Sequence, residues 1–163
     1  MKKVGFVLSI LILVLGCGPS ETKENVATIP GIVAVDVHGN FTDIGFELTK
    51  DIKTTRSSWT VTDETTEHDF TVVIYGTPSE VFEIEATALN FSSKDTGEVT
   101  KAFLGYVATI PYDGSSPIEA KKWVESNINT SAETTFGSVE LEIVANPDSP
   151  RARILMISPV DKD

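Results

Sequence analysis

The sequence predicts a two-layer α+β domain: a mostly antiparallel sheet of about six strands, with two helices on one face. Most apolar stretches alternate with Glu and Thr, as strands with one solvated face do. Two later stretches repeat at three and four residues, as helices do. The apolar face of such a sheet must be covered, and the two helices are the available cover. The expected order is therefore four strands, two helices and two strands.

The start of the domain contains an apolar stretch, residues 31–37, that can form a strand. Residues 38–45 can then form one helical turn, with Phe41 and Ile44 inward and Gly45 ending the turn in a left-handed conformation.

The four strands that follow this turn are predicted from alternation. They are 45–50, with Phe46 and Leu48 on one face; 58–62, with Trp59 and Val61; 70–76, apolar on both faces; and 80–91, with Phe82, Ile84, Ala86 and Ala88.

The last two strands are predicted at 138–145 and 152–158. The first of them alternates apolar residues with Glu140 and Glu142. The sequence NPDSP at 146–150 separates the strands, and two prolines with an aspartate favour a turn. We therefore expect these strands to form a hairpin.

Two stretches between the fourth and fifth strands show helical periodicity. In 97–110 the β-branched residues also permit a strand, and Pro111 would end a helix. In 115–128, Ser116, Pro117 and Glu119 form the pattern of a capping box with proline at the first helical position. The predicted buried stripes are Val99, Ala102, Phe103, Tyr106, Val107 and Ile110 for the first helix, and Ala120, Trp123, Val124 and Ile128 for the second.

The N-terminus has the pattern of a secretory signal peptide. Lys2 and Lys3 precede an apolar run that reaches Gly16, which is too short for a transmembrane helix of about 18 to 20 residues. The run ends in Leu13-Val14-Leu15-Gly16-Cys17. This ending resembles the lipobox of bacterial lipoproteins, in which a small residue precedes the cysteine. The resemblance implies cleavage between Gly16 and Cys17, and acylation of Cys17.

The same resemblance implies a place in the cell. Lipoproteins of this class carry two or three acyl chains, which together anchor a protein stably without a transmembrane helix. In a two-membrane bacterium, Gly18 after the cysteine implies the outer membrane, since no Asp stands there; in a one-membrane host the protein would lie at the cell surface. An ordinary secretory signal with a chance cysteine is the alternative. The expected organisation is a signal peptide at 1–16, a lipidated tether at 17–30 and one domain at 31–160.

The composition restricts the partners. The formal net charge of −11 would become −13 once the signal peptide, with its two lysines and no acids, is removed. Nucleic acid is a poor partner for so acidic a chain, and anionic lipid headgroups should repel it, so the lipid must provide the anchoring. Cys17 is the only cysteine, which excludes intramolecular disulfides and cysteine metal sites. The 147 residues that follow position 16 suit one domain.

Two loops combine histidine with acids. Asp36, His38 and Asp43 could be a metal cluster, but the Gly and Asn between them favour a turn with a surface histidine. The segment DETTEHD at 63–69 could hold a cation loosely, yet it lacks EF-hand spacing and the required glycine. We expect it to be a solvated hairpin tip. No metal or cofactor is predicted.

Paired carboxylates occur at Glu83 with Glu85, and at Glu140 with Glu142. Their spacing permits glycoside hydrolysis, but every solvated strand produces such pairs. No G-x-S-x-G or glycine-rich phosphate loop is present. An envelope hydrolase, needing these acids or His38 at a pocket, is the least favoured interpretation.

Val73 and Tyr75 are the candidate interaction patch. If Phe70, Val72 and Ile74 face the helices, these two lie among Thr and Glu on the open face, where they could receive a partner. Trp59 and Trp123 are instead expected in the core.

The favoured function is a non-catalytic, lipid-anchored module that binds an envelope protein. The alternative is a small-molecule or ion-binding lipoprotein with a pocket around Tyr106 and Tyr112.

Overall fold

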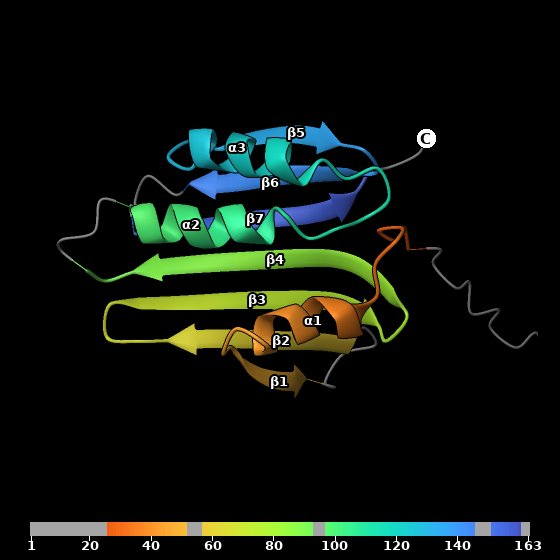
Figure 1. The fold of residues 1–163 in the computed structure, drawn as a ribbon, viewed down its shortest axis with the longest axis horizontal. Helices are drawn as coiled ribbons and strands as arrows, with labels where there is room; N and C mark the ends of the chain where they lie inside the picture. The colour runs from red at the N-terminus through yellow and green to blue at the C-terminus, as the bar shows by residue number, and fades with distance from the viewer. Residues whose placement is uncertain (1–25, 52–56, 93–96, 146–150, 161–163) are drawn as a thin grey trace, which may run out of the picture.

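The structure is a computed structural model that describes residues 26–51, 57–92, 97–145 and 151–160 (Figure 1). It is an α+β fold in which a seven-stranded antiparallel sheet packs against three helices. The elements, in chain order, are α1 (Ala34–Thr42), β1 (Glu47–Asp51), β2 (Ser57–Glu64), β3 (His68–Thr77), β4 (Glu80–Asn90), α2 (Glu98–Val107), α3 (Pro117–Asn127), β5 (Ala132–Phe136), β6 (Val139–Ala145) and β7 (Ala152–Pro159).

The strand order is β1-β2-β3-β4-β7-β6-β5. The first four strands form a meander. The chain then forms α2 and α3, and continues into β5, β6 and β7 on the other half of the sheet. The last strand pairs with both β4 and β6, which confirms the predicted C-terminal hairpin and joins the two halves of the sheet. Figure 1 shows all three helices on the same side of this sheet.

The core lies between the helices and that one face of the sheet. Its register is continuous across the junction of the two halves: Val72 is opposite Ala86, Ala86 opposite Leu155, and Leu155 opposite Ile143. All four side chains have no exposed surface. The predicted alternation therefore places one apolar row over four strands, as an antiparallel sheet with one solvated face requires.

The predicted strand at 31–37 is wrong, because α1 occupies Ala34–Thr42. The buried residues are Ala34, Val37 and Phe41, whose spacing of three and four is helical. Phe41 is inward as expected and Gly45 has the expected left-handed φ of 104°. Ile44, however, is 57% exposed, since it follows the end of the helix.

The stretch 97–110, which permitted either a helix or a strand, forms helix α2. The side of this helix that is buried differs from the predicted side. Phe103 and Val107 are buried, whereas Val99 and Tyr106 are exposed. The reason is that α2 packs against α3 as well as β4. At Gly105 a Cβ would lie 3.4 Å from the Lys121 side chain of α3. Thr100 and Leu104 are buried in place of Val99 and Ala102.

Helix α3 has Ser116 at its N-cap and Pro117 at its start, as predicted. The capping box is not formed, because Ser116 makes no capping hydrogen bond with its side chain. Of the predicted stripe, Ala120, Val124 and Ile128 are buried, and Trp123 is partly buried, edge-to-face with Phe136 at 6.5 Å.

Strand β5 was not predicted from the sequence. It is a five-residue strand at the sheet edge, AETTF, and its alternation is too short and polar to distinguish it from a loop. A second difference is in β4, where Val81 is buried and Phe82 only partly so. A register shift between Tyr75 and Gly76 of β3 reverses the alternation at this end of the strand.

The folded region includes the end of the predicted tether. Ile29 is 2% exposed, and its backbone N–H donates to the Val81 carbonyl oxygen at 2.8 Å. The described chain therefore begins beside the start of β4.

Candidate functional site

The face of the sheet opposite the helices carries the predicted interaction patch and both predicted glutamate pairs. We call it the open face, and define it by side chains that alternate with the buried rows of five strands. They are Thr60, Thr62, Thr71, Val73, Tyr75, Glu83, Glu85, Thr87, Glu140, Glu142, Val144, Ile154, Met156 and Ser158, all partly buried by their neighbours. No helix of the described chain covers this face (Figure 1).

Val73 and Tyr75 lie on this face, as their alternation with Val72 and Ile74 predicts. In the register, Val73 is opposite Glu85 and Tyr75 is opposite Glu83. Partial burial raises the pKa of the Tyr75 hydroxyl, and the carboxylates of Glu85 and then Glu83 raise it further. The tyrosine ring therefore lies within the electrostatic field of both acids.

The two pairs of glutamates flank one strand. Glu83 and Glu85 are on β4, Glu140 and Glu142 are on β6, and β7 runs between them. Met156 of β7 is opposite both Glu85 and Glu142. We call these four carboxylates the acidic frame. Strand geometry makes the frame roughly 10 Å wide across the strands and about 7 Å long along them.

The acidic frame has no counter-charge in the described chain. The ion pairs among the described residues are His68–Asp63, Lys101–Glu98 and Lys121–Glu125. None of them involves a glutamate of the acidic frame. The described basic side chains lie elsewhere. Lys101 is on α2, Lys121 and Lys122 are on α3, Arg151 lies in the turn before β7, and Arg153 donates through Nε to the Ile128 carbonyl oxygen at 2.7 Å.

Asp36, His38 and Asp43 are separated by their helix. Asp36 is in the first turn of α1, and Asp43 is its C-cap. The His38 ring stacks on Trp59, with ring centroids 6.1 Å apart. Burial lowers the pKa of His38, and Asp36 partly opposes this effect. Trp59 itself is in the core, as predicted.

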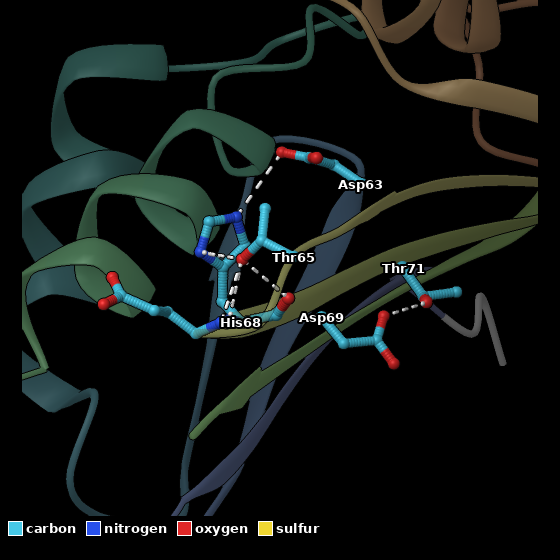
Figure 2. A network of polar contacts seen from close by, with 6 residues as sticks. Asp63, Thr65, His68, Asp69 and Thr71 are labelled. Atoms are coloured by element: carbon cyan, nitrogen blue, oxygen red, sulfur yellow. Dashed lines mark hydrogen bonds and ion pairs between the residues drawn. The ribbon is translucent and has the colours of Figure 1, made fainter. Parts of the chain in front are cut away.

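The DETTEHD segment forms the β2–β3 hairpin end, where His68 organises the polar contacts (Figure 2). Its Nε2 lies 3.5 Å from an Asp63 carboxylate oxygen, and its Nδ1 lies 3.2 Å from the Thr65 hydroxyl. The ring also stacks on Phe70 at 4.3 Å, and Phe70 stacks on Phe103 at 4.3 Å. Asp69 instead accepts a hydrogen bond from Thr71 on the other side of the strand (Figure 2). These contacts join the hairpin to α2, which indicates a structural role.

A small cleft lies beside this hairpin, lined by residues that include His68, Phe70 and Thr100. Its volume is about 40 Å³, which suits ordered water rather than the roughly 300 Å³ or more of a ligand pocket. The predicted pocket residues lie apart from it: Tyr106 is 39% exposed and packs edge-to-face on Phe41, and Tyr112 is buried.

The Tyr112 hydroxyl is buried without a hydrogen-bond partner in the described part of the chain. Burial raises its pKa. We expect Tyr112→Phe to be neutral, or to raise the free energy of unfolding by up to about 1 kcal/mol, because an unpaired buried hydroxyl costs free energy. Urea unfolding followed by tryptophan fluorescence measures this. A loss of more than about 1 kcal/mol would show that the hydroxyl has a stabilising partner.

Among the described residues, no three His, Cys, Asp or Glu side chains gather where they could hold a metal ion. None of the helices in the described ranges is long and apolar enough to cross a membrane. Gly16, Cys17 and the predicted turn at 146–150 lie outside those ranges. No protein-family model, curated protein or solved structure matches this chain.

The sequence identified each glutamate pair, but not that the two pairs share a face around one strand. That neighbourhood depends on β7 lying between β4 and β6, and residues far apart in sequence carry no local signal of such pairing.

Proposed function

We propose that this protein is a lipid-anchored module outside the cytoplasm, without catalytic activity, that binds a protein of the cell envelope through its open face. The observation that carries the proposal is a broad sheet face with apolar side chains among acids, uncovered in the described chain. The apolar members are Val73, Tyr75, Val144, Ile154 and Met156. These side chains are only partly buried, and apolar surface that is grouped on one accessible face is typical of interaction sites.

The lipobox at Gly16–Cys17 supports the anchoring part of the proposal. A chain from Cys17 to the buried Ile29 can span at most about 40 Å. Ile29 joins the fold beside the start of β4, at an end of the strands rather than on either face. Attachment at that end leaves the open face accessible to a partner near the membrane.

Acylation of Cys17 is the first prediction from this proposal. Cells that express the chain should incorporate labelled palmitate into it, and Cys17→Ala should incorporate none. The mass of the mature N-terminus should show cleavage after Gly16. An unlabelled, water-soluble native chain would show that the cysteine falls at this position by chance.

Position-specific photocrosslinking in cells tests the binding surface. A photoreactive residue replaces Val73 on the open face, and in a matched protein it replaces Ile118, which is 71% exposed on α3. We expect a discrete crosslinked product from position 73 only, and loss of that product when Cys17→Ala is added. Equal products from both positions, or none from position 73, would contradict the proposed surface.

A further inference from the structure

We propose that the acidic frame receives a basic protein segment, in which Lys or Arg side chains bind the four glutamates while their aliphatic stems lie on Met156 and Val73. This inference rests on the proposed function, because it specifies which partner chemistry the open face accepts. Its basis is the arrangement of charge and apolar surface around β7.

The first argument is electrostatic. Glu83, Glu85, Glu140 and Glu142 are partly buried, and none is in an ion pair in the described chain. At the edge of the same face, Glu142 is directly opposite Glu133. Like charges directly opposite on neighbouring strands repel. A cationic partner relieves this repulsion, whereas a neutral or acidic one does not.

The second argument comes from what lies between the charges. Along one row the register runs Thr60, Val73, Glu85, Met156 and Glu142, so carboxylates alternate with apolar side chains. Lys and Arg bury an aliphatic stem on apolar surface while the charged end stays near an acid. Methionine adapts its shape to such stems, and the Tyr75 ring can take a cation on its face.

Other occupants fit this surface less well. Nucleic acid and anionic lipid would be repelled. A second copy placed face to face would bring the same acids together. A single Ca²⁺ ion needs oxygen ligands at about 2.3 to 2.6 Å, and the strands that carry the frame spread its four glutamates over roughly 7 by 10 Å.

The test uses the full chain, purified in a neutral detergent, and a fluorescent peptide of lysines interspersed with leucines. The binding variant combines Glu83→Gln, Glu85→Gln, Glu140→Gln and Glu142→Gln. The control variant makes the same change in net charge away from the open face, through Asp36→Asn, Asp43→Asn, Glu67→Gln and Glu119→Gln. All four control residues are exposed. Circular dichroism and melting temperatures check that both variants fold.

We expect the binding variant to weaken the peptide affinity at least about tenfold, and the control variant to change it less than about threefold. A matched peptide with glutamate in place of lysine should not bind. Binding should also weaken with added salt, because the attraction is between charges near the surface. If the binding variant fails to fold, the pairs Glu83→Gln with Glu85→Gln and Glu140→Gln with Glu142→Gln are measured separately, and each should weaken binding.

Equal weakening by both variants would reveal a general charge effect and overturn the proposal. So would the absence of binding, or binding of Ca²⁺ or self-association in place of peptide binding. These failures are distinct from failure of the proposed function. A specific crosslink at position 73 together with no effect of the binding variant would retain the docking surface and reject its basic partner.

Discussion

Replacing Phe41 with alanine is expected to lower the free energy of unfolding by about 3 to 5 kcal/mol. The side chain has no exposed surface and comes from α1, which packs on β2 and β3. Its ring lies 5.4 Å from that of Phe46 and 5.8 Å from that of Tyr106, edge-to-face in both cases. The truncation therefore leaves a cavity where α1, α2 and the sheet meet. Urea unfolding followed by circular dichroism measures the loss.

The matched control is Val35→Ala in the same helix. Val35 is 55% exposed, so we expect its change to stay within about 0.5 kcal/mol. A Phe41→Ala loss below about 1 kcal/mol would contradict the central position of α1 in the core.

Replacing Gly76 with alanine is the second large effect. A Cβ there would collide with the Glu80 carbonyl oxygen and lie 3.1 Å from the Val81 Cα, both of them backbone atoms. Backbone atoms of a hairpin cannot move aside without breaking the β3–β4 pairing that continues on either side of the register shift. We expect a loss of about 2 kcal/mol or more in the free energy of unfolding.

Gly39→Ala is the matched comparison, and it is expected to raise the stability of the protein rather than lower it. Gly39 lies inside α1, and a Cβ there would meet nothing within 4 Å. Alanine is favoured over glycine in a helix by about 0.5 to 1 kcal/mol, so this variant should be more stable than the native protein. Thermal unfolding of both variants side by side measures the difference. Similar melting temperatures for the two would show that the strand has room for a side chain at Gly76.

The two large effects also separate stability from binding. Phe41 belongs to the helix side of the sheet, and the open face carries the proposed partner site. The acidic frame should cost stability through mutual repulsion of its carboxylates, so its glutamines should not reproduce the losses expected at Phe41 and Gly76. The four glutamates of the acidic frame are in no ion pair of the described chain, so their negative charge stays available to a partner.

The local character of most elements is predictable from the amino-acid sequence alone. Alternation identified β2, β3, β4, β6 and β7, and residues at three and four apart identified α3 and the existence of α2. The same alternation placed Val73 and Tyr75 on the face away from the core. These features were predictable because the side-chain periods of strands and helices are properties of the backbone.

The prediction from sequence is wrong where a short apolar segment fits both the strand period and the helix period. Residues 31–37 are apolar enough for a strand, but Ala34 and Val37 are three residues apart and would point to opposite faces of a strand. Both can face the core together only when the chain is helical there. The sequence shows the helical periodicity of α2. Which side of this helix is buried depends on its packing against α3, which the sequence of α2 does not show.

Which strands are neighbours in the sheet depends on how the whole chain folds. The insertion of β7 between β4 and β6 brings Glu83 and Glu85 to the same surface as Glu140 and Glu142, although more than fifty residues separate the pairs. Pairing between distant strands depends on how whole apolar rows align over the core, rather than on the residues of either strand alone. The glutamate pairs were therefore determined by the sequence, and the acidic frame they form was decided by the fold.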